Sequence, residues 1–210
     1  MSRIFLLAAR GFLAKGRKMR RTQIELLSPS VGRVLFIGDS ITEQGMWSEW
    51  FPEFDTLNRG IASDTVGGVR SRLAYAIYDP AVIVLLIGTN DLSGLGRSTS
   101  VRDISGQMRD LVSGIRELAP TQRLIINSVM PRQRSYAKRV QRLNMEYRKI
   151  AAEFAADYLD LWPTLANSSG VLRPEYTEDN LHLNGSGYRA WVDVLRPAIF
   201  ADQWNEKGKK

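Results

Sequence analysis

The chain has 210 residues, enough for one domain with a hydrophobic core, and 44% of them are hydrophobic and 24% charged. It holds no cysteine and a single histidine, His182, which excludes disulfides, a thiolate nucleophile and a metal centre of several histidines. Residues 1–33 contain eight basic residues and one acid, so they account for the whole formal net charge of +7. A basic leader on a neutral domain does not favour nucleic acid as a partner.

Residues 1–30 form this basic leader, and its apolar run, Ile4–Ala9, is interrupted by Arg10. The run is shorter than the roughly 7–15 apolar residues of a secretory signal, and no later stretch approaches the ~18–20 of a membrane span. We therefore predict a cytoplasmic protein. Three interpretations of the leader stay open: a helix packed on the domain, a ragged terminus, or a helix in peripheral contact with an anionic membrane.

Five short segments predict the strands of a sheet. Val34–Ile37 ends at Gly38 and Ala81–Ile87 ends at Gly88, and both are continuous apolar runs of the kind found in buried parallel strands. The remaining strands are predicted at Phe54–Asn58, Arg123–Val129 and Tyr158–Leu161.

Segments with helical spacing of apolar residues separate these strands. We predict helices at Ile41–Trp50, Thr65–Tyr78 and Val101–Leu118, around Val140–Phe154, and from Gly185 onward, with an irregular stretch at Trp162–Leu183. The alternation predicts a single α/β domain, residues 31–203, followed by a basic tail, 204–210. Its expected architecture is a three-layer α/β/α sandwich whose five-stranded, mostly parallel sheet has the flavodoxin-like order 2-1-3-4-5.

Four short polar stretches stand at loop positions of this predicted fold. They are Gly38-Asp39-Ser40, Asn58-Arg59-Gly60, Gly88-Thr89-Asn90-Asp91 and Asp179-Asn180-Leu181-His182. The first three follow the first three strands, and the fourth precedes the last helix. In a doubly wound sheet all four can meet at the carboxyl edge, where ligands bind.

Each candidate residue also has a purely structural interpretation. Ser40 is a favoured type of helix N-cap, Asn90 a common turn residue, Asp179 a loop acid, and a lone histidine such as His182 is often a surface or core residue. The four stretches taken together nevertheless resemble the SGNH (GDSL-type) hydrolases, a family of serine esterases and lipases. Gly38–Thr42 is similar to the family's first block, Gly60 to the glycine of the second, Gly88–Asp91 to the third and Asp179–His182 to the fifth. The resemblance covers residues 33 to about 197 and leaves out the leader.

Ester cleavage needs a nucleophile, a base, an orienting group and an oxyanion hole, and the resemblance implies a residue for each. Ser40 would attack the acyl carbon, His182 would move the proton, and Asp179 would orient the imidazole. The oxyanion donors would be the backbone N–H groups of Ser40 and Gly60 and the side-chain amide of Asn90. This scheme uses no cofactor and no metal. Asp39 and Asp91 are expected to hydrogen-bond neighbouring loops without a chemical role.

The predicted function is hydrolysis of short-chain acyl esters through a covalent acyl-enzyme, with a small-molecule ester as the partner and a homo-oligomer left open. Few residues are left to build a lipid-binding lid. Trp47 and Trp50 are spaced so that one of them can put an aromatic ring beside the acyl site, with core packing expected of at least one of the two. The alternatives are a lysophospholipase or acyl thioesterase with the same site, and a catalytically inert binding protein. The basic cluster at residues 132–142 is predicted to be a solvated surface, with contact to an anionic substrate or lipid as its alternative.

Overall fold

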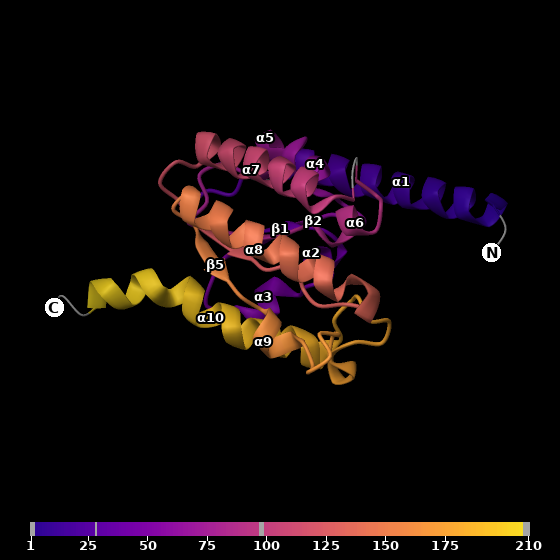
Figure 1. Cartoon of the computed structure of the whole chain (residues 1–210). Coiled ribbons are helices and arrows are strands. Elements are labelled where there is room, and N and C mark those ends of the chain that lie inside the picture. The colour runs from indigo at the N-terminus through magenta and orange to yellow at the C-terminus, as the bar shows by residue number, and fades with distance from the viewer. Residues whose placement is uncertain (1–2, 28, 97–98, 208–210) are drawn as a thin grey trace.

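A computed structural model gives the fold and describes residues 3–27, 29–96 and 99–207. At its centre lies one sheet of five strands (Figure 1). The strands are β1 (Val34–Gly38), β2 (Thr56–Gly60), β3 (Val82–Leu86), β4 (Arg123–Asn127) and β5 (Asp157–Leu159). They pair in parallel throughout, in the order β2-β1-β3-β4-β5. The predicted strand order is therefore confirmed.

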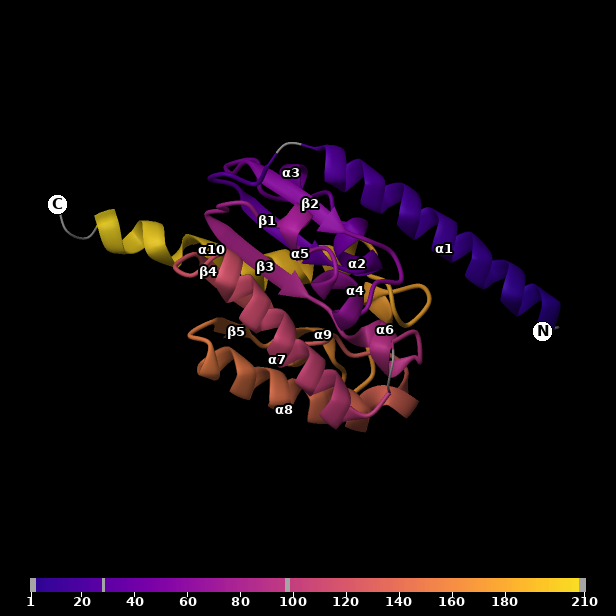
Figure 2. The same cartoon turned by 90° about the horizontal axis from the view of Figure 1, so that it is seen from above.

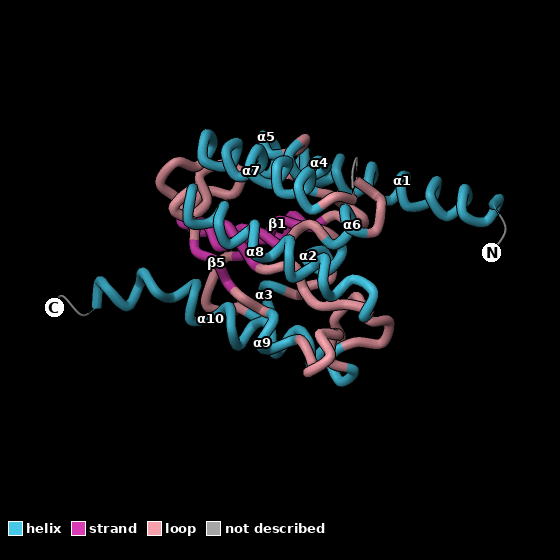
Figure 3. Tube along the Cα trace, viewed as in Figure 1, coloured by secondary structure: helices cyan, strands magenta, loops and turns pink. Residues whose placement is uncertain are grey.

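Helices cover both faces of the sheet and complete the predicted three layers (Figures 1 and 3). One face packs against α4 (Val66–Arg70), α5 (Leu73–Ala76), α7 (Val101–Leu118) and α8 (Ala137–Glu153). The other packs against α2 (Ser40–Glu43), α3 (Trp47–Trp50), α9 (Trp162–Leu165) and α10 (Gly185–Lys207). Shorter elements are α6 (Thr89–Leu92), just after β3, and the 3-10 helices η1 (Arg134–Tyr136) and η2 (Pro174–Tyr176).

The alternation of side chains along the strands divides the core into two parts. In β1, Leu35 and Ile37 belong to the cluster under α7 and α8, whereas Val34 and Phe36 belong to the cluster under α3 and α10. All four side chains are buried. Burial of each contributes about 1.5–3 kcal/mol, so a continuous apolar run is stable only as a central strand.

Two predicted helices are each divided into two short ones, which corrects the sequence analysis. Ile41–Trp50 becomes α2 and α3, because the Trp47 side chain turns into the core and its Nε1 donates to the Thr42 carbonyl at 2.9 Å. Thr65–Tyr78 becomes α4 and α5, and the interruption falls where Arg72 turns inward to form a buried ion pair. In both places a tertiary contact overrides the helical pattern of the sequence.

The leader contains one long helix, α1 (Arg3–Leu26). Its C-terminal half lies against the domain: Ile24 is buried, and Arg20 donates to the Asn58 and Gly60 carbonyls at 3.3 and 3.4 Å. The N-terminal half extends beyond the rest of the chain (Figure 2). None of the helices in the described part of the chain combines the length and apolar character needed to span a membrane.

The predicted basic tail, 204–210, begins inside a helix. The α10 helix continues to Lys207, and residues 208–210 lie outside the described part of the chain.

Candidate active site

The carboxyl edge of the sheet gathers the predicted polar stretches. Strand β1 leads through Asp39 directly into α2, and β3 leads through Gly88 into α6. Gly88 has φ +123°, and a Cβ at this position would lie 2.6 Å from the Tyr147 hydroxyl oxygen, so only glycine fits the turn. These abrupt strand-to-helix turns bring Ser40 and Asn90 to the ends of neighbouring strands.

Ser40 is the first residue of α2, and the preceding residue supplies the helix cap. The Asp39 carboxylate accepts the Ile41 N–H at 3.0 Å. The N-cap interpretation of the sequence therefore applies to Asp39 and not to Ser40. Because Ser40 lies in the first turn, its backbone N–H has no partner within the helix and is directed outward at the N-terminal end of α2.

Ser40, His182 and Asp179 form a continuous hydrogen-bonded chain. Ser40 Oγ lies 3.0 Å from His182 Nε2, and His182 Nδ1 lies 2.6 Å from Asp179 Oδ2. An ionised carboxylate only accepts hydrogen bonds, so Nδ1 carries the proton and Nε2 is left to accept from the serine. The His182 and Asp179 side chains are 32% and 52% exposed, so the site is open to solvent.

Backbone N–H groups hold the Asp179 carboxylate in its ionised form. Its Oδ1 accepts the N–H groups of Leu181 and His182 at 2.9 and 2.8 Å. Partial burial opposes ionisation, but the hydrogen bonds from the His182 ring and from these N–H groups outweigh it and lower the pKa of Asp179 to about 2. Asp179 is therefore charged at every pH at which the protein is expected to work.

The irregular stretch before α10 is fixed by its own hydrogen bonds. Ala166 and Leu172 form an isolated antiparallel bridge, and Leu172 is buried. Beyond the His182 loop, the Tyr188 hydroxyl of α10 donates to the Ile41 carbonyl of α2 at 2.6 Å. This bond ties the helix after His182 to the helix that begins with Ser40. The stretch is thus an ordered support for the histidine and the aspartate.

Asn90 lies at the same edge with part of its amide already engaged. Its Nδ2 donates to the Asp64 carbonyl at 2.9 Å, and the amide has a second N–H to donate. The side chain is buried, so this orientation is fixed by the surrounding structure. The sequence predicted Asn90 at this edge but gave no indication of Asp64, which fixes its orientation.

Gly60 has a different environment from the one expected of an oxyanion donor. Its N–H donates to Asn58 Oδ1 at 3.0 Å, so donation to a substrate would require that bond to be shared or exchanged. A Cβ on Gly60 would lie 2.2 Å from the Glu43 backbone nitrogen, so close packing of β2 on α2 already requires glycine here. In the following turn Ser63 has φ +61°, an uncommon conformation for serine, which the sequence did not reveal.

Three carboxyl groups, those of Asp39, Asp64 and Asp91, are buried near the turn that joins β1 to α2. Asp64 is paired with Arg72 at 2.8 Å, and Asp91 Oδ2 accepts the Val66 N–H at 3.1 Å. Burial raises the pKa of Asp39; the Ile41 hydrogen bond opposes this, and the charges of Asp64 and Asp91 add to it, giving about 7. Asp91 contacts a neighbouring segment as expected, but Asp39 instead caps its own helix, α2, and the Asp64–Arg72 pair was not predicted from the sequence.

The two tryptophans after Ser40 have different environments. Trp47 is buried and stacks on Phe36 with ring centroids 4.0 Å apart, so it belongs to the core. Trp50 is half-buried, and the Arg189 guanidinium lies 5.0 Å from its ring centroid. Trp47 therefore has the core-packing role that was expected of at least one of the two tryptophans.

The basic cluster at residues 132–142 is only partly a solvated surface. Arg132 is buried, and its Nη1 donates to the carbonyl and hydroxyl oxygens of Thr89 and to the Ser93 hydroxyl, at 3.2, 3.1 and 2.6 Å. Arg139 donates to the Leu92 carbonyl at 3.2 Å. These two arginines brace α6, the four-residue helix that carries Asn90.

Comparison with known proteins adds the family context. A sequence model of the GDSL-like lipase/acylhydrolase family matches residues 36–190. A search of curated proteins finds no significant match.

Solved structures of similar fold come from several bacteria. A Streptococcus pneumoniae protein, provisionally named a platelet activating factor, superposes with a TM-score of 0.86 at 24% identity, covering 95% of this chain and 100% of its own. A GDSL-like lipase from Bacteroides thetaiotaomicron gives 0.74 at 23% identity, with 89% and 98% covered. A variant of an acetyl-xylooligosaccharide esterase from Geobacillus stearothermophilus gives 0.64 at 18%, with 81% and 95% covered. At these identities the likeness concerns the fold alone.

Proposed function

Because the chain belongs to the GDSL-like lipase/acylhydrolase family and is a carboxylic ester hydrolase, we propose that it cleaves short-chain acyl esters through Ser40, His182 and Asp179. The observation that carries this proposal is the hydrogen-bonded chain from Ser40 Oγ through the His182 ring to Asp179. A nucleophile, a base and an orienting carboxylate in this order are what acyl transfer to a serine needs.

The proposed reaction has two steps. Ser40 Oγ attacks the acyl carbon while His182 Nε2 takes the hydroxyl proton, and the imidazolium then gives that proton to the leaving alcohol as the ester bond breaks. Water attacks the acyl-serine in the second step and loses a proton to His182; the imidazolium then gives that proton to Ser40 Oγ as the acyl–oxygen bond breaks, and the carboxylic acid leaves with the Ser40 hydroxyl restored. Asp179 stays ionised and stabilises the imidazolium in both steps.

The negative charge that develops on the acyl oxygen needs hydrogen-bond donors that are already in place. We assign this role to the Ser40 backbone N–H and the second N–H of the Asn90 amide. The Ser40 N–H lies at the N-terminal end of α2, where backbone N–H groups have no partner within the helix. The Asn90 amide is oriented by its hydrogen bond to the Asp64 carbonyl. The Gly60 N–H stays the predicted third donor, and to act as one it must share its hydrogen between Asn58 Oδ1 and the acyl oxygen, or exchange its present bond for one to the acyl oxygen.

Short acyl chains are proposed because few residues of the chain are left to build a lid over a long one. The longest irregular stretch is occupied with holding Asp179 and His182, and Trp47 belongs to the core. Each CH₂ that stays in water forgoes about 0.8 kcal/mol of burial energy, so longer chains gain little. The acetyl-ester substrate named for the Geobacillus stearothermophilus neighbour agrees with a small acyl group.

The test is kcat/KM for p-nitrophenyl esters from acetyl to dodecanoyl, each kept below its aggregation limit. We expect acetyl to butyryl esters to be cleaved with higher kcat/KM than octanoyl and longer ones. A steady rise beyond octanoyl would support the lysophospholipase or long-chain thioesterase alternative. Absence of turnover on every ester would support an inert binding protein. The cytoplasmic location stays a prediction of the sequence.

A further inference from the structure

We propose that the contact between α1 and the domain is a binding site for a phosphate-class anion, such as free phosphate or the phosphomonoester headgroup of a lipid. A pocket of about 300 Å³ lies between α1, α4 and the turn before α4. Four cationic side chains line it, Arg17, Lys18, Arg21 and Arg72, together with one acid, Asp64. The site is separate from the proposed triad and does not rest on the proposed function.

The single acid of this pocket is already used by one of the four cations. Asp64 Oδ2 accepts Arg72 Nε at 2.8 Å, and the pair is buried. Arg21 pairs with Glu25 at 3.0 Å, on the exposed side of α1. Lys18 has no hydrogen bond or ion pair with any residue that the structure describes. The pocket therefore keeps an excess of positive charge that an anion would neutralise.

Arg72 leaves one donor group without an acceptor inside the protein. Its Nε binds Asp64 and its Nη2 donates to the Gly38 carbonyl at 3.1 Å, but its buried Nη1 has no partner among the described residues. Burial lowers the pKa of Arg72, Asp64 opposes this, and the charges of Arg21 and Arg20 lower it further. A buried N–H group of a charged side chain is costly to leave unpaired, and Arg72 lines the pocket, so an anion there would interact favourably with its incompletely paired guanidinium.

Phosphate is the anion whose chemistry fits these donors. A phosphomonoester carries about −1.5 to −2 charges near neutral pH and three acceptor oxygens, whereas a carboxylate carries one charge and two oxygens. Arginine pairs well with phosphate oxygens, and lysine acts as a point charge beside them. The Ser71 hydroxyl also lines the pocket and already accepts from Arg21 Nη1 at 3.5 Å.

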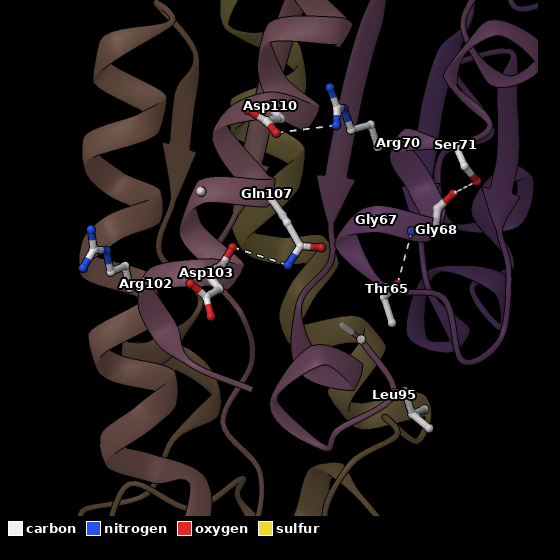
Figure 4. A pocket seen from close by; sticks show the side chains of 12 residues that line it. Thr65, Gly67, Gly68, Arg70, Ser71, Leu95, Arg102, Asp103, Gln107 and Asp110 are labelled. Carbon is white, nitrogen blue, oxygen red and sulfur yellow. Dashed lines mark hydrogen bonds and ion pairs between the residues drawn. The ribbon is translucent and has the colours of Figure 1, made fainter. Parts of the chain in front are cut away.

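A second groove, on the other side of α4, shows that this charge excess is local. It lies between α4 and α7, has a volume of about 1150 Å³, and is larger than the α1 pocket (Figure 4). Its cations and acids are equal in number: Arg70 and Asp110 pair at 3.5 Å, and Arg102 stands beside Asp103. Anion binding is therefore expected at the α1 pocket and not here, and Arg102 offers a matched control position.

The first experiment is calorimetric titration of the full chain with inorganic phosphate, with chloride as reference at constant ionic strength. We expect saturable binding by the natural sequence, at least tenfold weaker binding by the double variant Arg17→Gln/Lys18→Gln, and less than twofold change in Arg102→Gln. Arg72 is left intact, because its removal would leave Asp64 buried and unpaired. Thermal unfolding of each variant checks that the fold is retained.

The second experiment separates the two sources of phosphate. Phosphatidylcholine vesicles are doped either with phosphatidic acid, a phosphomonoester, or with phosphatidylglycerol, a phosphodiester, at equal surface charge. Preference for phosphatidic acid that is lost in Arg17→Gln/Lys18→Gln supports a lipid source, and phosphate binding without vesicle preference supports a soluble one. The proposal is overturned if neither phosphate nor phosphatidic acid binds selectively, or if Arg102→Gln weakens binding as much as the double variant does.

Discussion

Ser40 Oγ lies 3.0 Å from His182 Nε2, although 142 residues separate the two in the chain. The contact depends on α10 reaching back to α2, where the Tyr188 hydroxyl donates to the Ile41 carbonyl. Ser40 is thus held at the start of α2 and His182 in the loop just before α10, and those two helices are tied to each other. This arrangement places the serine in position before any substrate arrives, which is what an activated nucleophile requires.

Replacement of Ser40 by alanine tests the nucleophile. We expect Ser40→Ala to lower kcat by about 10⁴-fold or more while the thermal unfolding midpoint stays close to that of the natural protein, because Asp39 and not Ser40 caps α2. Ser186→Ala, at an exposed serine of α10, is the matched control and should keep full activity. Normal turnover by a folded Ser40→Ala protein would remove Ser40 from the mechanism.

Replacement of Asn90 by alanine tests the oxyanion hole. Loss of one donor to a developing charge typically lowers kcat by about 10²–10³-fold with little change in KM. The variant should also lose about 1–3 kcal/mol of unfolding free energy, because the buried Asp64 carbonyl loses its partner. Steady-state kinetics and denaturant unfolding measure the two effects. A large rise in KM at constant kcat would instead make Asn90 a residue that binds the ground state.

Arg132 is expected to act on catalysis through Asn90, as a positioning residue. Arg132→Lys keeps the charge but cannot reproduce the bonds of Nη1 to Thr89 and Ser93, so α6 should shift and kcat fall by about 10–100-fold at similar KM.

The decisive control for Arg132 is the double variant with Asn90→Ala. If Arg132 acts by placing Asn90, then Arg132→Lys should cost little further activity in that background. Fully additive losses would show that Arg132 acts by another route. Arg134→Lys, at an exposed position of the same cluster, should leave the kinetics unchanged.

Asp39 should make stability depend on pH between about 4 and 7. Its pKa in the folded protein is about 7, above the ordinary 3.8, so the folded state favours the protonated form. The resulting stabilisation is present below the ordinary pKa and is lost as pH rises through 7, by at most about 4 kcal/mol. Asp179, whose pKa is lowered to about 2, has the opposite sign, and its contribution changes only below about pH 4.

The variant Asp39→Asn isolates this effect, because its side-chain oxygen can still accept the Ile41 N–H. Denaturant unfolding at pH 5 and pH 8 should show a smaller difference in unfolding free energy for Asp39→Asn than for the natural protein. Asp91, whose pKa burial raises to about 6, is retained and should keep part of the dependence. An identical pH dependence in both proteins would show that Asp39 is ionised without cost in the folded state.

Much of the fold could be predicted from local sequence because the signals are local. An apolar run such as Val34–Ile37 is stable only where both faces of a strand are covered, and the glycine after it marks the turn at the sheet edge. The helical pattern of Val101–Leu118 likewise matched α7. The helical patterns of Ile41–Trp50 and Thr65–Tyr78 did not give single helices. Trp47 turns inward and donates to Thr42 of the preceding helix, and Arg72 turns inward and donates to Gly38, which is far away in the chain.

The sequence by itself determined the alternation of strands and helices, the family resemblance and the placement of Ser40, Asn90, Asp179 and His182 near one edge of the sheet, because these follow from short-range patterns and motif spacing; the strand order was an expectation from the fold class that the structure confirmed. Only the tertiary structure decided which hydrogen bonds those residues make. In the folded chain the Gly60 N–H donates to Asn58, the Asp39 carboxylate caps α2, and the Arg132 guanidinium donates to Thr89 of α6. The cationic pocket beside α1 also exists only in the folded chain. The partner of a polar group depends on which segments lie side by side in space, and no local sequence pattern records which segments these are.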